Sequence, residues 1–237
     1  MSHQMRLGVR LVTAVVLVGG LAGCSPGVTV GSDAKPSLPG QGPAGERGAP
    51  AVRALPGLST TAVARTQLGG LKVATQQAMT GYSRAKFTHW AGQGDGCDTR
   101  DVVLERAGKD VKRDSECKAV SGTWVSVYDG ITVTDAGKLD IDHMVPLANA
   151  WRSGAGSWTA ERRKEFANDL THPQLLAVSA ATNRAKGDQG PDEWQPPVKT
   201  YWCTYAMAWT NVKSTYQLTV TEPEKMKLNE MLETCPS

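Results

Sequence analysis

Two short stretches of the chain combine acidic, imidazole, amide and basic side chains at close spacing. The first reads DIDHMVP (residues 140–146), and the second, 40 residues after His143, reads NRAKGD (residues 183–188). Hydrolysis of a phosphodiester requires a base that deprotonates water. It also requires a cation that neutralises the charge growing on the phosphate and on the leaving oxygen. The two stretches contain residue types suited to both tasks.

Each of these side chains suits one part of such a reaction. The imidazole of His143 titrates near working pH, so its neutral form can act as the general base. The oxygens of Asp142 and Asn183 suit Mg²⁺, which keeps several waters and takes few protein ligands; Mn²⁺ and Zn²⁺ are the alternatives. Arg184 and Lys186 add positive charge where a phosphate would sit.

The elements around these residues must bring the two stretches together. We expect a strand over 139–144, a short apolar strand over 175–178 and a helix that Ser179 caps and that runs to Lys186. Adjacent strand residues point to opposite faces, so Asp142 and His143 reach one site only if the strand bends there. Asn183, the fifth residue from Ser179, can face back onto the strands. The order is strand, strand, helix.

The pattern D-x-D-H-x-x-P … L-L-x-V … N-R-x-K-G-D resembles the HNH endonucleases, also called ββα-metal or His-Me finger nucleases, over about residues 139–188. The wider arrangement, from about Gly81 to Cys235, is similar to exported bacterial HNH-family proteins. The resemblance implies that His143 is the general base and that Asp142 and Asn183 hold the metal. The flanking features that carry the wider likeness are Tyr82-Ser83-Arg84, His89-Trp90, Cys97-Asp98-Thr99-Arg100, Tyr128-Asp129-Gly130 and a Trp-rich C-terminal part.

One position departs from the family pattern. The middle residue, often Asn or His, is Gln174 in this chain. In relatives this residue braces the active-site loop through backbone hydrogen bonds, which a glutamine can also form. Asp140 is expected to be a hydrogen-bond partner of the site rather than a ligand, and Asp188 to anchor the end of the helix.

Simpler structural roles compete for several of these residues. An Asp-His pair is usually structural when it stands alone, and N-R-x-K alone is a helix cap or a solvated face. His89 and Trp90, with Arg84 and Arg100, either line a substrate groove or pack beside Cys97, and the sequence leaves both open. His172 is expected to be a bystander or a brace. A stripe formed by Trp202 and Trp209 favours a core position over a base-stacking platform.

The N-terminus carries an export signal. Arg6 and Arg10 precede an apolar run over 11–22 that is too short to span a bilayer, and the run ends in Leu-Ala-Gly-Cys24. This ending resembles a bacterial lipobox, which predicts that Cys24 is acylated and anchors the protein to the outer face of the membrane. An ordinary secretory signal with a chance cysteine is the alternative. The predicted boundaries are 1–24 for the leader, 25–57 for a Gly/Pro-rich tether and 58–237 for the nuclease-like domain.

Four cysteines remain after the leader, and an even number in an exported chain predicts two disulfides. Three pairings are open; we favour the sequence-local one, Cys97 with Cys117 and Cys203 with Cys235. A four-cysteine metal site is the rival interpretation, but no C-x-x-C pair supports it. A hydrolase with a cysteine nucleophile would need one of these thiols free.

Charge gives no separate indication of a polyanionic partner. Of the 26 Lys and Arg residues two lie in the leader, which leaves 24 against 23 Asp and Glu. Basic groups that bind nucleic acid must therefore be local. Further elements are expected as helices over 59–80, 158–170 and 198–213, a hairpin pairing 123–128 with 131–134, and a last helix beginning at Thr221, whose capping box includes Glu224.

These inferences predict an α+β fold: a ββα-metal core with flanking helices, a β-hairpin and two disulfides. The preferred function is a metal-dependent endonuclease that hydrolyses DNA, with RNA as the alternative substrate, outside the cytoplasm. The protein would be lipid-anchored or secreted. The competing hypothesis is a surface-anchored module that binds nucleic acid or protein on the same fold with little turnover. The oligomeric state is left undetermined.

Overall fold

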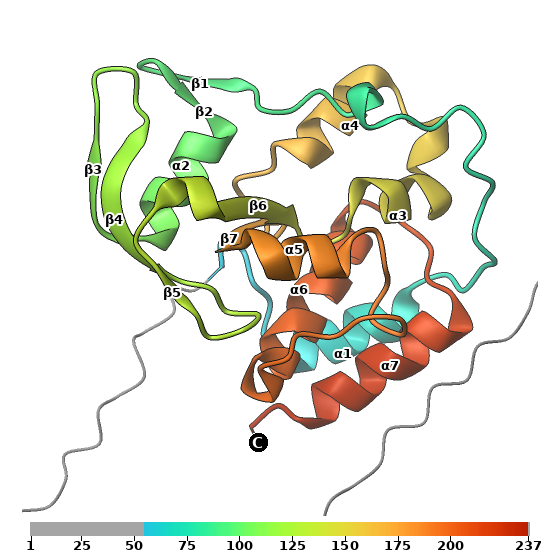
Figure 1. The fold of residues 1–237 in the computed structure, drawn as a ribbon. Coiled ribbons are helices and arrows are strands. Elements are labelled where there is room, and N and C mark those ends of the chain that lie inside the picture. The colour runs from blue at the N-terminus through green and yellow to red at the C-terminus, as the bar shows by residue number, and fades with distance from the viewer. Residues whose placement is uncertain (1–54, 237) are drawn as a thin grey trace, which may run out of the picture. The chain divides into compact units, whose positions relative to one another are not determined.

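The computed structural model describes residues 55–236, and these belong to one compact unit. Figure 1 shows how their helices and strands are arranged. The predicted leader, Cys24 and the tether up to residue 54 lie outside the described residues. None of the described helices is long and apolar enough to cross a membrane.

Seven α-helices and three small sheets make up the described part of the chain, so the fold is α+β as predicted. The helices are α1 (Thr61–Gly70), α2 (Thr99–Ala107), α3 (Leu147–Arg152), α4 (Ala160–Ala167), α5 (Ala180–Lys186), α6 (Trp202–Thr215) and α7 (Glu222–Glu233). The strands are β1 (Gly92–Gly94), β2 (Cys97–Asp98), β3 (Lys109–Arg113), β4 (Ala119–Val125), β5 (Thr132–Val133), β6 (Leu139–His143) and β7 (Leu175–Ser179). Strands β1 and β2 pair, β3-β4-β5 form a second sheet, and β6 pairs with β7.

The β6–β7 pair lies at the centre of the described unit, and α5 follows it directly (Figure 1). The pairing is antiparallel, with Asp142 opposite Leu176 and His143 opposite Leu175. All five residues of β7 are buried, which suits a short apolar strand covered on both faces. The Ser179 hydroxyl accepts a hydrogen bond from the backbone of Thr182, so it caps α5 as predicted.

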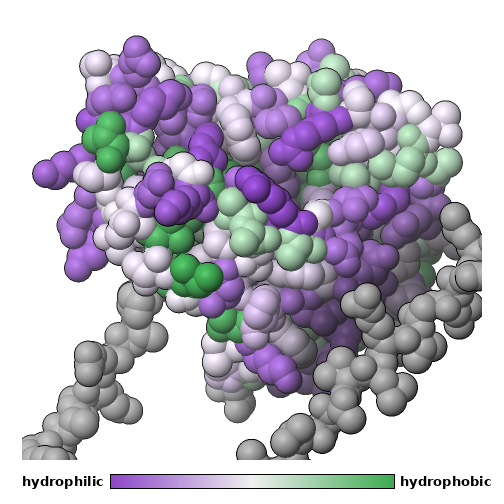
Figure 2. Space-filling model, viewed as in Figure 1, coloured by the Kyte–Doolittle hydropathy of each residue, from purple (hydrophilic) through white to green (hydrophobic). Residues whose placement is uncertain are grey.

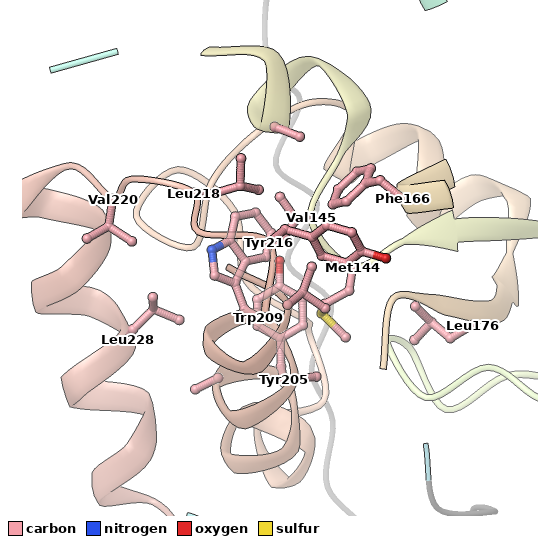
Figure 3. Close-up of a cluster of buried hydrophobic side chains, with 14 of the residues drawn as sticks. Met144, Val145, Phe166, Leu176, Tyr205, Trp209, Tyr216, Leu218, Val220 and Leu228 are labelled. Atoms are coloured by element: carbon pink, nitrogen blue, oxygen red, sulfur yellow. The ribbon is translucent and has the colours of Figure 1, made fainter. Parts of the chain in front are cut away.

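Two clusters of buried apolar side chains enclose this pair. Figure 3 shows the larger cluster, in which Trp209 and Tyr205 of α6 meet the ends of β6 and β7. The indole of Trp209 is fully buried, which confirms the expected core position. The smaller cluster lies against α2 and includes Leu139 and Ile141 of β6. Leu175 and Ala177 of β7 belong to it as well, whereas Leu176 and Val178 belong to the larger cluster, so alternate residues of β7 pack on its two sides.

The face of the molecule drawn in Figure 2 is mostly polar. In the view of Figure 2, hydrophilic residues cover much of the visible face, and isolated hydrophobic residues appear on the side of β3–β5. Val120 on β4 and Ile131 before β5 are among the exposed apolar side chains, at 63% and 51% exposure. Single exposed apolar residues of this kind are ordinary for a folded surface.

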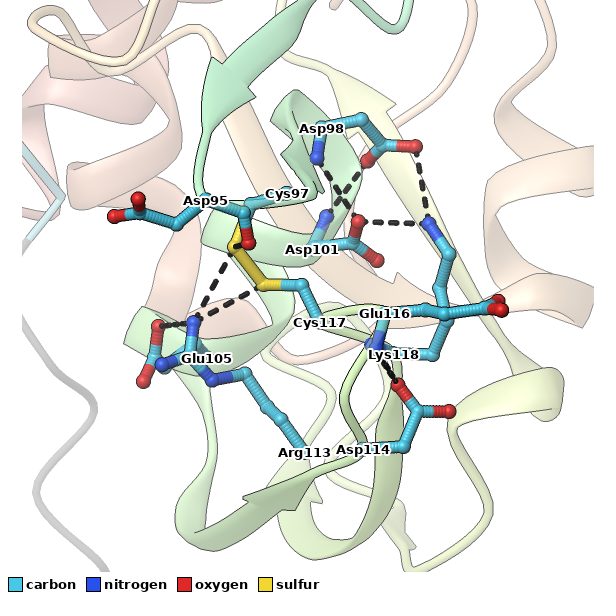
Figure 4. Close-up of a disulfide and its surroundings, with 10 residues drawn as sticks. All are labelled: Asp95, Cys97, Asp98, Asp101, Glu105, Arg113, Asp114, Glu116, Cys117 and Lys118. Carbon is cyan, nitrogen blue, oxygen red and sulfur yellow. Dashed lines mark hydrogen bonds and ion pairs between the residues drawn. A yellow bond between two sulfur atoms is a disulfide. The ribbon is translucent and has the colours of Figure 1, made fainter.

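Both predicted disulfides are present. Cys97 pairs with Cys117, which joins β2 to the turn between β3 and β4 (Figure 4). Cys203 pairs with Cys235, which joins α6 to the chain after α7. The bridges close loops of 20 and 32 residues. Each bridge restricts the unfolded chain and so stabilises the folded state by an amount on the order of 3 kcal/mol. All four cysteines of the described residues are oxidised, so none of these four offers the free thiol that a cysteine nucleophile requires.

Several boundaries differ from the sequence predictions. The first helix ends at Gly70 instead of continuing to residue 80, because Gly69-Gly70 disfavours helical backbone and Leu71 is extended. Helix α2, which follows Cys97 closely and begins with a capping box between Asp98 and Asp101, was not predicted. The hairpin is confirmed by β4 and β5 with shorter strands, but β3 and α3 were not predicted.

Candidate functional site

A pocket of about 240 Å³ opens where β6 ends and α5 passes over it. Its lining includes three residues predicted for catalysis and metal binding, Asp142, His143 and Asn183. Three charged side chains also line it: Arg84, Arg184 and Asp188. Residues 40 positions apart in the chain thus face one cavity, which leaves room between them for an ion or a phosphate group.

The carboxylate of Asp142 is buried and held by two donors. The ammonium of Lys186 lies 2.9 and 2.8 Å from its two oxygens, and the Tyr128 hydroxyl donates to Oδ2 at 2.6 Å. Burial raises the pKa of Asp142 above its ordinary value, and the charge of Lys186 opposes that rise. Burial likewise lowers the pKa of Lys186, and Asp142 opposes that shift. Each charge therefore depends on the other for its stability in the interior.

Lys186 occupies a different place from the predicted one. Its side chain is fully buried, and its ammonium also donates to the carbonyl oxygens of His143 at 2.9 Å and Met144 at 3.1 Å. It therefore lies beneath the strand end and is not available beside a phosphate in this structure. Arg184, the other predicted phosphate ligand, has 78% of its side chain exposed and does line the pocket.

His143 is 4% exposed, and the imidazole is held on two sides. Its Nε2 lies 3.0 Å from the carbonyl oxygen of Ala167. A carbonyl only accepts, so in the neutral ring Nε2 carries the hydrogen and Nδ1 keeps the lone pair. The indole of Trp90 stacks on the ring, with centroids 5.7 Å apart and planes at 11°. Burial lowers the pKa of His143 to about 3, and the positive charge of Arg84 adds to the effect, so the ring is neutral at pH 7.

Asn183 is oriented by the other acidic residue of β6. Its Nδ2 donates to Asp140 Oδ2 at 3.2 Å, and Arg184 Nε lies 3.8 Å from the same oxygen. Because the amide nitrogen of Asn183 donates this bond, its amide oxygen Oδ1 points away from Asp140. Within residues 55–236 no hydrogen bond to that oxygen is found. Asp140 thus occupies the partner position expected for it.

Gln174 supports the loop that follows β6. The side chain is fully buried; its Oε1 accepts from Val145 N at 3.1 Å and its Nε2 donates to Val145 O at 3.0 Å. The backbone adds a further bond, from Met144 N to Gln174 O at 2.7 Å. This is the bracing geometry that the resemblance implied, formed here by a glutamine.

The remaining candidates have structural partners. Arg100 donates to two backbone carbonyls, of Ala136 and Leu139, so it does not line the pocket. His172 lies 2.7 Å from Asp169, away from the pocket lining.

Asp188 forms a 2.9 Å ion pair with Arg152 beyond the end of α5. Sequence reasoning assigned Tyr128 to a hairpin and to the flanking feature Tyr128-Asp129-Gly130, and it missed the bond of the hydroxyl to Asp142. A tyrosine directly before Asp-Gly carried no signal that its hydroxyl would reach a carboxylate 14 residues later.

Comparison with known proteins gives the chain a family. Residues 98–231 match the family described as GmrSD restriction endonucleases, C-terminal domain. A relative from Arthroderma benhamiae, called an uncharacterized secreted protein, is 52% identical over 180 residues, which cover 76% of this chain and 88% of that protein. No solved structure matches the chain. The family match spans more than half of the sequence, and the chain therefore belongs to the family of GmrSD restriction endonuclease C-terminal domains.

Proposed function

We propose that the protein is a metal-dependent endonuclease of the HNH type that hydrolyses phosphodiester bonds of DNA, with RNA as the alternative substrate. The observation that carries this proposal is the single pocket shared by Asp142, His143 and Asn183. The order of β6, β7 and α5 supports it, because a ββα-metal core is built from a strand, a second strand and a helix in this order. Membership of a restriction endonuclease family supports a nucleic-acid substrate.

The donor groups fit a divalent cation. A carboxylate offers about four lone-pair positions, and the three hydrogen bonds from Lys186 and Tyr128 leave Asp142 Oδ1 with one free. The amide oxygen of Asn183 supplies a second donor. The described residues contain no group of three or more His, Cys, Asp or Glu side chains placed to hold an ion. Two oxygen donors with water in the remaining positions suit Mg²⁺ best; Mn²⁺ and Zn²⁺ remain alternatives.

The protein's own groups would divide the work of hydrolysis. The Ala167 carbonyl and the stacked Trp90 indole fix the orientation of the His143 ring. Its Nδ1 would accept the proton of the attacking water. The exposed guanidinium of Arg184 would contact the substrate phosphate at the pocket rim. A divalent ion held by Asp142 and Asn183 would neutralise charge on the phosphate and on the leaving oxygen.

We further propose that the enzyme acts outside the cytoplasm. The relative from Arthroderma benhamiae is named as a secreted protein, and two disulfides suit an oxidising compartment. Anchoring through an acylated Cys24 is the more specific proposal. A Cys24→Ser variant tests it: membrane fractions should lose the protein and the medium should gain it, whereas unchanged partitioning would contradict the anchor.

A cleavage assay with a matched histidine control tests the proposed activity. Purified protein with Mg²⁺, Mn²⁺ or Zn²⁺ should nick plasmid DNA or degrade RNA, and His143→Ala should lower the rate by at least about a hundredfold because it removes the general base. His172→Ala removes a histidine outside the pocket lining and should keep activity. Thermal unfolding would confirm that both variants fold.

The competing function is a binding module with little turnover. The ion pair of Lys186 with Asp142 favours it, because a lysine already occupies most of the carboxylate that would hold the metal. Wild-type protein that binds DNA or RNA but cleaves neither with any of the three metals would support the module and contradict the nuclease. Equal cleavage by wild type and His143→Ala would contradict the assigned base.

A further inference from the structure

One wall of the pocket comes from a segment that lies before the family match. The match begins at residue 98, whereas Tyr82 and Arg84 line the pocket and Trp90 stacks on His143. In Figure 1 this part of the chain runs from α1 past α3 and α4 to β1. We refer to residues 82–91 as the wall segment.

The wall segment is fixed to the core at its centre. The ring of Phe87 is fully buried and packs against Phe166 of α4, with centroids 6.1 Å apart. The side-chain amide of Asn168 forms two hydrogen bonds with the backbone that follows this anchor. Its Nδ2 donates to Thr88 O at 2.7 Å, and its Oδ1 accepts from Ala91 N at 2.8 Å. A segment held in this way can position side chains at the pocket without help from a ligand.

Arg84 begins the short 3₁₀ turn Arg84–Lys86, and its carbonyl accepts from Phe87 N at 3.0 Å. The backbone of Arg84 is thereby tied to the anchor while its side chain stays exposed. Its guanidinium forms no hydrogen bond or ion pair with any residue that the structure describes. Several other arginines are engaged by backbone carbonyls or carboxylates: Arg65, Arg100, Arg113, Arg152, Arg162 and Arg163.

We propose that Arg84 binds a backbone phosphate of the nucleic acid, adjacent to the bond that is cleaved. The proposal rests on the nuclease function above and adds to it a substrate contact from outside the matched family region. A planar guanidinium has five N–H donors and can form bidentate hydrogen bonds with two phosphate oxygens. Because the chain after the leader is close to neutral, such local cations must supply the attraction for a polyanion.

Salt dependence distinguishes this role from a structural one. Binding of a labelled DNA duplex would be measured from 50 to 300 mM salt in a His143→Ala background, which prevents cleavage. Adding Arg84→Ala should weaken binding by about tenfold and reduce the slope of log K against log salt by about 0.9, the value of one phosphate contact. Arg84→Lys should keep the slope while losing part of the affinity. Lys112→Ala, an exposed lysine on β3, removes the same charge and should change neither.

Cleavage kinetics separate failure of this inference from failure of the proposed function. Both proteins in this assay retain His143. If wild type cleaves DNA and Arg84→Ala does so with unchanged KM, kcat and salt slope, the Arg84 contact is wrong and the proposed nuclease function is still supported. If wild type cleaves no nucleic acid and the duplex binds with equal affinity in both Arg84 forms, both proposals fail. A slope that is reduced by about 0.9 in Arg84→Ala but not in Lys112→Ala supports the contact.

Discussion

At the scale of single residues, the least expected feature is a buried lysine beneath the candidate metal ligand. Sequence reasoning placed Lys186 where a substrate phosphate would sit, as added positive charge beside the metal. In the structure, its ammonium instead joins Asp142 to two backbone carbonyls at the end of β6. Lys186 lies three positions after Asn183 on α5, and residues at this spacing share one face of a helix. Both side chains therefore face β6, where Asn183 lines the pocket and the longer Lys186 side chain reaches Asp142.

Replacing Lys186 by Met should destabilise the protein strongly. The variant leaves the buried carboxylate of Asp142 without its counter-charge, a change that costs about 3–5 kcal/mol of unfolding free energy. Urea titration measures the loss, and Lys112→Met, on an exposed position of β3, should cost less than about 0.5 kcal/mol. Adding Asp142→Asn to Lys186→Met should restore part of the loss. Equal stability of the two lysine variants would show that the ion pair contributes nothing.

At the scale of elements, the sequence predicted what local signals determine. The cap at Ser179, the alternation in 139–143 and the capping box at Thr221 all depend on neighbouring residues, and all three elements form as expected. Strand β3 was missed because its residues, KDVKR, are mostly exposed and charged and pair only through tertiary context. Helix α3 was missed because it has only six residues and begins directly after Pro146.

The wall segment illustrates the same limit for the site. Its place beside His143 depends on the burial of Phe87 and on the bonds of Asn168, a residue 80 positions away from Thr88. No periodicity or local motif predicts a contact at that distance. The sequence could therefore name Arg84 and Trp90 as candidates but could not decide between a groove and packing beside Cys97. In the structure Trp90 lies against His143, and Arg84 lines the pocket.

At the scale of the whole molecule, the burial of His143 links the site to the stability of the fold. The ring is buried, so a positive charge on it is poorly solvated, and its pKa falls to about 3. In the unfolded chain a histidine has a pKa near 6.5, so between these values the unfolded state binds the extra proton. Stability from this group is therefore complete above about pH 6.5 and is lost as the pH falls toward 3.

The unfolding free energy should accordingly decrease on acidification before the carboxylates titrate. Between about pH 6 and 4.5 the contribution of His143 approaches 1.4 kcal/mol per pH unit. Urea unfolding of wild type and His143→Phe across this range isolates that contribution, because the other titrating groups are common to both proteins. As the pH falls, the unfolding free energy of wild type should decrease more than that of His143→Phe. Parallel curves would contradict neutral burial of the imidazole.

The central claim is that Asp142 and Asn183 bind one divalent ion beside His143, and calorimetric titration of the purified protein with Mn²⁺ tests it most directly. We predict one site per chain, weakened at least tenfold by Asp142→Asn or Asn183→Ala and unchanged by Asp110→Asn, on an exposed position of β3. Absence of binding by wild type, or equal affinity in wild type and both ligand variants, would contradict the claim.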